Sequence, residues 1–205
     1  MKFSFGRIHG LVNGDRFALR CAKIFTASLK LSHSEASTAP FAHLEPRIVW
    51  QHFATLCAIP RPSKQEAALR ETLKTWAEVR GLGTQVDQAG NLIIRKPASV
   101  DGTHLPTVVL QAHLDMVCQA NAAVDHDFSR DSIKPVERDG WLIAENTTLG
   151  ADNGIGVALI LAALEDNTLT HGPLEALLTV DEEAGMGGAR GLASGVLQSK
   201  LMLNL

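Results

Sequence analysis

Two polar side chains, His113 and Asp115, interrupt a run of residues that otherwise favours a buried strand. Residues 108–110 are apolar and mostly β-branched, which is typical of a strand covered on both faces in an α/β sheet. Side chains two apart in a strand point to the same face, so His113 and Asp115 are expected to lie together. An imidazole beside a carboxylate is either a hydrogen-bonded structural pair or the start of a functional site, and this pair alone leaves both open.

Further acidic side chains follow other predicted elements. Asp152 begins a helix after a loop, and Glu182 and Glu183 end another buried strand. Each has an ordinary structural explanation, because Asp is a good helix N-cap and paired glutamates suit a solvated turn. Together with His113 and Asp115, however, they fall at the carboxyl ends of strands, the edge of an open α/β sheet where ligands bind.

The chemistry of this set favours a metal centre. Four carboxylates and one imidazole at one edge repel one another unless protons or cations offset their charge. Two divalent ions do this best, and these ligand types suit zinc, manganese or cobalt in a catalytic site, since no cysteine takes part. Asp152 can bridge two ions, and His113 can bind one while a carboxylate fixes its tautomer. Adjacent glutamates diverge, so one can bind metal while the other handles a proton.

The elements that must position these residues alternate between helix and strand. Helices are predicted over residues 47–59, from a Ser63–Glu66 capping box to Gly81, and over 153–166. Strands are predicted on either side of a Gly90–Asn91 turn, from residue 108, over 174–183 and over 200–205, with a loop-rich section before Thr148 and a short helix after residue 184. The alternation indicates an α/β layer fold with a largely parallel sheet.

The composition restricts the class of protein. With 45% hydrophobic and 20% charged residues, the 205-residue chain is globular, and its net charge of -3 without a basic run disfavours nucleic acid as a partner. The cysteines, Cys21, Cys57 and Cys118, lack CxxC spacing and fit a reducing cytoplasm. The longest apolar stretch, residues 156–164, falls far short of the roughly 20 residues that cross a bilayer, so no membrane association is expected.

Residues 1–43 differ from the rest because basic residues greatly outnumber acidic ones. Residues 17–31 can form a basic amphipathic helix like that of an organelle transit peptide, but the segment has no uninterrupted apolar core for a secretory signal. We expect a disordered or extraneous extension ahead of a domain that spans residues 44–205.

The motifs QAHLDMV, TTLGADNGIG and TVDEEAGM, with HDF at residues 126–128, resemble those of the M20 family of metallopeptidases, in particular its aminoacyl-histidine (Xaa-His) dipeptidases. The likeness runs from about Leu44 to Leu205 and includes CAIPRPSKQE and QAGNLIIRKP. It implies the N-terminal part of a zinc-peptidase-like catalytic domain, truncated before the lid domain. It also implies a dipeptide substrate, two divalent metal ions with zinc expected, and full-length relatives that are homodimers.

The resemblance also implies a role for each site residue. His113 would bind one ion, Glu183 the other, and Asp152 both. Glu182 would be the base that activates the water, and Asp115 would support His113. A family ligand Asp after KLMLNL and a distant ligand His fall outside the chain, so an incomplete, inactive fragment is expected.

The sequence leaves three alternatives open. An N-acyl amino-acid deacylase of the same family shares the HxD and EE patterns, and a non-catalytic fragment would fold or bind metal without turnover. A dinucleotide site at GMGGARG is the weakest alternative, because the acidic residues 181–183 beside it would repel phosphate.

Asn146 stands where the family often has glycine, a mild change because Asn tolerates positive φ.

Overall fold

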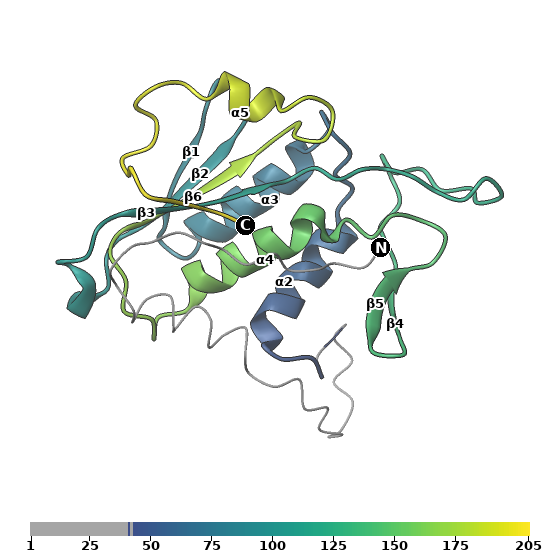
Figure 1. Cartoon of the computed structure of the whole chain (residues 1–205), viewed down its shortest axis with the longest axis horizontal. Helices are drawn as coiled ribbons and strands as arrows, with labels where there is room; N and C mark the ends of the chain where they lie inside the picture. The colour runs from purple at the N-terminus through teal and green to yellow at the C-terminus, as the bar shows by residue number, and fades with distance from the viewer. Residues whose placement is uncertain (1–40, 42) are drawn as a thin grey trace.

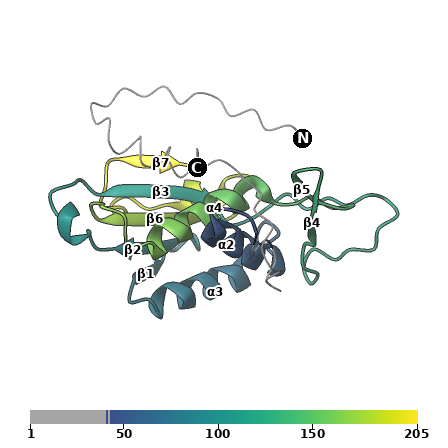
Figure 2. The same cartoon turned by 90° about the horizontal axis from the view of Figure 1, so that it is seen from below.

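A five-stranded sheet lies at the centre of the fold in the computed structural model, which describes Phe41 and residues 43–205 (Figure 1). Most of the predicted basic extension, residues 1–40 and 42, lies outside the described residues. The sheet order is β1-β2-β6-β3-β7, and in Figure 2 the strands lie one above another in this order, with β7 at the top. Their bounds are Gly83–Val86 (β1), Leu92–Lys96 (β2), Val108–His113 (β3), Leu174–Thr179 (β6) and Met202–Asn204 (β7).

The strand directions confirm the predicted α/β fold with a mostly parallel sheet. β3 pairs in parallel with both β6 and β7, whereas β2 is antiparallel to both β1 and β6. Because β1 thereby runs in the same direction as β6, β2 alone opposes the other described strands of this sheet. The β1–β2 hairpin turns at Gly90, which has a φ of 93°, as the Gly90–Asn91 prediction requires.

Three helices cover one face of the sheet: α2 (Arg47–Ala58), α3 (Ala67–Glu78) and α4 (Ala151–Glu165). α2 buries Val49, Phe53, Leu56 and Cys57 at helical spacing, and α3 buries Leu69, Leu73 and Ala77. Fully burying a side chain such as Phe53 or Leu69 stabilises a fold by about 1.5–3 kcal/mol, so this shared core holds helices and sheet together. A smaller apolar cluster on the opposite face includes Ile93, Val109 and Leu177.

The start of α3 contradicts the predicted capping box. The N-cap residue is Glu66, without a side-chain cap hydrogen bond, and the helix begins at Ala67. The Ser63 hydroxyl instead donates to Oδ2 of Asp115, and Glu66 Oε1 accepts from the backbone amides of Lys64 and Asp181. Contacts with Asp115 and Asp181, from distant segments, therefore replace the predicted capping of Ser63 and Glu66 by each other.

The start of α4 is irregular. Its N-cap is Gly150 in the left-handed region, with φ 70°, and the Asp152 carboxylate lies 3.1 Å from Nε2 of His113 instead of bonding a backbone amide of the helix, so the N-cap explanation for Asp152 is wrong. Asp152 (φ -86°, ψ 111°) and Asn153 (φ -109°, ψ 31°) depart from helical angles. Asp152 thus lies in extended backbone ahead of the regular turns, and the helix that follows is almost entirely buried. Within the described residues, no helix has the length and hydrophobicity to cross a membrane.

A hairpin occurs where the sequence analysis expects only loops. β4 (Pro135–Arg138) pairs with β5 (Trp141–Ala144) and stands apart from the main sheet (Figures 1 and 2). Its two-residue turn, Asp139–Gly140, has φ of 52° and 78°. Positive φ at both positions is typical of the tight turn that Asp-Gly favours, so this dipeptide was the overlooked signal. A short helix, α5 (Gly187–Gly191), and a 3-10 turn, η1 (Val100–Gly102), complete the described elements.

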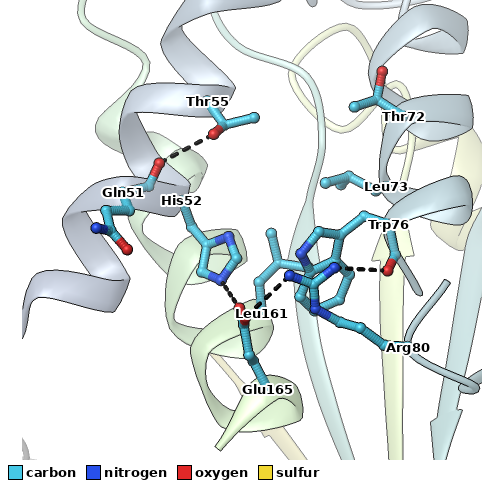
Figure 3. A pocket seen from close by; sticks show the side chains of 9 residues that line it. All are labelled: Gln51, His52, Thr55, Thr72, Leu73, Trp76, Arg80, Leu161 and Glu165. Atoms are coloured by element: carbon cyan, nitrogen blue, oxygen red, sulfur yellow. Dashed lines mark hydrogen bonds and ion pairs between the residues drawn. The ribbon is translucent and has the colours of Figure 1, made fainter. Parts of the chain in front are cut away.

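A hollow of about 280 Å³ lies between α2, α3 and α4, and Figure 3 shows its polar lining. Glu165 accepts from Nη2 of Arg80 at 3.0 Å and lies 3.0 Å from Nε2 of His52. The Arg80 guanidinium stacks on Trp76, 4.4 Å from the ring centroid. These polar groups bind one another, so the hollow lies at a polar contact, here called the seam, that holds the three helices together.

Candidate metal centre

The strand ends bring the acidic residues together at one edge of the sheet. β3 and β6 are parallel neighbours, and His113 at the end of β3 is in register with Thr179 at the end of β6. The residues after β6, including Glu183, therefore reach the same edge as His113. Ligand atoms of His113, Asp152 and Glu183 all lie within 4.8 Å of one another, close enough to share an ion.

His113 presents its Nε2 atom to this cluster. Its Nδ1 lies 3.1 Å from the backbone oxygen of Asp115. A carbonyl oxygen can only accept, so Nδ1 carries a proton, and Nε2 is the nitrogen that a metal would bind in place of its proton. Nε2 lies 3.1 Å from Oδ1 of Asp152 and 3.9 Å from Oε2 of Glu182.

One side of the cluster is buried and the other is open. The side chain of His113 is 8% exposed, whereas that of Asp152 is 66% exposed. Glu182 lies between these extremes at 35%. A small molecule can therefore approach the carboxylates from solvent while the imidazole stays fixed in the interior.

Asp115 lies behind the cluster and is fully buried. Its carboxylate accepts from Ser63 Oγ at 2.7 Å and from the backbone amides of Glu182 and Glu183, both at 3.0 Å. Burial by itself raises the pKa of Asp115, but hydrogen bonds from His113, Ser63 and the two amides lower that pKa well below its usual range. Asp115 is therefore ionised, and it holds the backbone that carries both glutamates.

The electrostatics of the cluster favour a cation. Burial raises the pKa of Glu183, and repulsion from Asp152 and Glu182 raises it further against the opposing effect of His113. Burial lowers the pKa of His113, but the hydrogen bond and charge of Asp115, with the other acids, raise it overall. The charged form of Glu183, which its acidic neighbours oppose, would be stabilised by a cation at this edge of the sheet. The nitrogen and oxygen donors fit zinc, manganese or cobalt.

All five residues singled out from the sequence lie at or directly behind this edge. His113, Asp152 and Glu183 form the ligand cluster, Glu182 lies beside it, and Asp115 lies behind it. The HDF motif does not join the described ligand cluster. Its His126 and Phe128 rings pack edge to face, with centroids 4.4 Å apart.

Sequence reasoning missed Arg61, Ser63 and Glu66, which contact the segments that carry the cluster. Ser63 and Glu66 were interpreted as local helix caps. The available signal was Arg61 itself, a charged residue between two prolines that separate buried helices. Proline on each side excludes a regular helix there, so the segment had to pack by other contacts.

Comparison with known proteins agrees with this geometry. The sequence model of peptidase family M20/M25/M40 matches residues 109–203. Cytosol non-specific dipeptidase from Escherichia coli is 49% identical over 163 residues, which cover 80% of this chain and 34% of that protein. The chain thus spans about a third of the length of this curated relative.

The chain is also similar in fold to solved peptidase structures. Aminoacylhistidine dipeptidase from Vibrio alginolyticus superposes with a TM-score of 0.77 at 48% identity, over 84% of this chain and 34% of that one. A tripeptidase from Staphylococcus aureus shares the fold, with a TM-score of 0.65 at 24% identity over 77% of this chain and 42% of that one. The matched residues include His113, Asp152 and Glu183. The chain is thus similar to the M20 peptidase family in sequence and in fold.

Proposed function

We propose that the chain supplies the metal-binding part of a dipeptidase that hydrolyses short peptides, Xaa-His dipeptides among them, with two divalent metal ions. The observation that carries this proposal is the cluster of His113, Asp152 and Glu183, whose ligand atoms lie within 4.8 Å of one another. The dipeptidase names of the relatives at 49% and 48% identity support the substrate class.

In this proposal His113 would hold one ion, Glu183 would hold the other, and Asp152 would be shared between them. Zinc is the expected metal, with manganese and cobalt compatible with the same donors. When bound, such ions polarise the scissile carbonyl and lower the pKa of a water. The exposed side of Asp152 leaves room for the peptide.

Glu182 is proposed as the base that takes a proton from the attacking water and passes it to the leaving amine. Its Oε2 lies 3.9 Å from Nε2 of His113, so the carboxylate is beside the ligand cluster without being held within it. Asp115 binds the Glu182 amide and supports His113, so it fixes the base relative to the ligands. General bases positioned in this way contribute about 10²–10⁴-fold to turnover.

The described residues give each ion two protein ligands if Asp152 is shared. A catalytic zinc usually has three protein ligands besides its water. We therefore propose that the 205 residues alone bind metal weakly and do not turn over dipeptides.

The test uses a chimera in which residues 44–205 replace the matching part of the Escherichia coli dipeptidase. With zinc or manganese, the chimera is expected to hydrolyse β-alanyl-histidine, whereas the 205-residue chain is not. Preference of the chimera for an N-acetylated amino acid would indicate a deacylase instead. Metal binding without turnover of either substrate would indicate a non-catalytic protein, and comparable dipeptide turnover by the 205-residue chain would show that it holds a complete site.

We also propose a cytoplasmic location, and we expect that full-length relatives are homodimers. The word cytosol in the name of the Escherichia coli relative supports the first. Cys57 and Cys118 are free thiols, and burial raises the pKa of Cys57 to about 11, so this thiol is unreactive at neutral pH. Sedimentation of the chimera would measure the oligomeric state.

A further inference from the structure

The segment of residues 61–66 carries no proposed ligand, yet it contacts each of the segments that do. The guanidinium of Arg61 is the centre of these contacts. Its Nη1 donates to the backbone oxygens of Leu114 at 3.0 Å and Asp115 at 3.1 Å, directly after His113. Its Nη2 donates to the backbone oxygen of Gly150 at 2.5 Å, two residues before Asp152. One side chain thus joins the end of β3 to the turn ahead of α4.

Other residues of the segment extend this connection. Ser63 Oγ donates to Oδ2 of Asp115, and Glu66 Oε1 accepts from the amide of Asp181, two residues before Glu183. Main-chain contacts add to it, because Arg61 O accepts from Met116 N and Pro62 forms a bridge with Met116. The His113, Asp152 and Glu183 segments are therefore tied to one short stretch of chain.

The surroundings leave space for a guanidinium and little else. Arg61 is 2% exposed. A Cβ added at Gly150 would lie 2.5 Å from Nη2 of Arg61, and one added at Gly154 would lie 2.8 Å from the same atom. Both distances are shorter than side chains tolerate, so glycine at these two positions makes the close approach possible.

A buried guanidinium is energetically unfavourable unless neighbouring groups offset the loss of its hydration. Among the described residues, no carboxylate oxygen lies within the 4.0 Å of an ion pair with Arg61. Backbone carbonyls alone receive its hydrogen bonds in the described part of the chain. Burying a charge without a partner of opposite sign is costly, and an apolar residue would avoid that cost. A structural role in the core alone therefore explains Arg61 poorly.

We propose that Arg61 is a positioning residue whose planar fork fixes the distance between the His113 and Asp152 segments and thereby sets the affinity of the site for divalent metal ions. The inference rests on the proposed function only in requiring that the cluster binds metal. Two nitrogens of one rigid group are needed, because Nη1 serves one segment and Nη2 the other.

Charge and geometry make opposite predictions for this residue. A fixed positive charge near the cluster repels a divalent cation, so its charge alone predicts tighter metal binding when Arg61 is replaced by a neutral residue. Positioning predicts weaker binding. Arg61→Lys keeps the charge but offers a single nitrogen, which cannot span both segments, whereas Arg61→Met removes charge and fork together and avoids the cost of burying a cation.

The experiment measures the Zn²⁺ affinity of the 205-residue chain by titration calorimetry at protein concentrations that resolve weak binding, and it records the visible absorption of the Co²⁺ form. We expect Arg61→Lys and Arg61→Met each to weaken Zn²⁺ binding about 10–100-fold, the usual effect of losing a group that orients ligands, and to change the Co²⁺ spectrum. Because Arg61→Met carries no buried charge, it keeps the test valid should Arg61→Lys fail to fold.

Lys96→Met is the matched control. Lys96 is also a buried cation that donates to a backbone oxygen, that of Asp166 at 2.7 Å, and it lies opposite Leu174, at the other edge of the sheet. Its loss should lower the melting temperature of the metal-free protein without changing Zn²⁺ affinity. Unchanged affinity in Arg61→Lys, tighter binding in Arg61→Met, or an equal loss in Lys96→Met would overturn the inference. Absence of metal binding in the unmodified chain would refute the proposed metal centre itself, and this inference with it.

Discussion

The carboxylate of Asp115 receives hydrogen bonds from Ser63 and from the amides of Glu182 and Glu183, and it lies 3.4 Å from Nδ1 of His113. It therefore holds the proposed ligands and the proposed base in one arrangement. Glu182 and Asp152 make different contacts within this arrangement, so substitutions can distinguish the proposed base from the proposed metal ligand.

The first substitution tests the role of Glu182 as the base. In the chimera, Glu182→Gln should lower turnover of dipeptides by about 100-fold or more, since the amide keeps the shape of the side chain but cannot take a proton. Zinc content should stay unchanged, because Glu182 lies outside the ligand cluster. Kinetics with metal analysis of the same sample checks both. Activity within about tenfold of the unmodified chimera would assign the base to another group.

Asp152 should behave differently. Asp152→Ala in the chimera should lose metal as well as activity, because two cations would face each other without the carboxylate between them. The side chain is 66% exposed, so the melting temperature of the metal-free protein should change little. Metal analysis that still finds two ions per chain would contradict the bridging role.

At the scale of elements, the sequence predicts the apolar ones well. The sequence predicts β3, β6 and α4 correctly because their long apolar runs are favourable only when they are buried in an α/β core. The acidic residues of the candidate site could be proposed for the same reason, since they interrupt or end these runs.

Tertiary contacts explain what the sequence did not predict. Ser63 and Glu66 have local caps available, but their partners in the structure are Asp115 and Asp181, far along the chain. Arg61 binds backbone carbonyls, and a carbonyl has no sequence signature. The β4–β5 hairpin had its signal in Asp139–Gly140, which was not used. The residues that support the site therefore could not be predicted from the sequence, because their partners are distant in the chain and many are backbone groups.

The seam between the helices offers a prediction about pH. Burial lowers the pKa of His52 below 6.5, against the opposing charge of Glu165. The unfolded chain therefore binds a proton that the folded protein resists, so stability falls as pH drops below about 6.5 toward the folded pKa. His52→Gln should make the melting temperature less sensitive to acid over this range.

A matched control is His104→Gln, which changes an exposed histidine in the loop before β3. Its melting temperature should fall with acid as in the unmodified protein. Equal acid sensitivity of both variants and the unmodified protein would show that His52 contributes nothing to this pH dependence. Thermal melts in metal-free buffer from pH 7 to about pH 5 make the comparison, because bound metal would add its own pH dependence.

At the scale of the whole molecule, the sheet is unevenly protected. Three helices cover one face, whereas the outer edge of β7 has no strand partner among the described residues. Apolar side chains gather at that edge: Leu201, Met202, Leu203 and Leu205 are each 43–48% exposed. An unpaired strand with apolar side chains is a template for pairing with another chain.

We therefore expect the 205-residue chain to self-associate with rising concentration through β7. Leu203→Lys should shift sedimentation toward the monomer, because a lysine on an edge strand opposes pairing by charge and by its need for water. Val100→Lys is the control: Val100 is 91% exposed in η1, away from β7, and its change adds the same charge to the surface. If both variants shift sedimentation equally, net charge is the cause; if neither does, β7 is not the contact. A shift confined to Leu203→Lys would identify the β7 edge as the surface through which two copies meet.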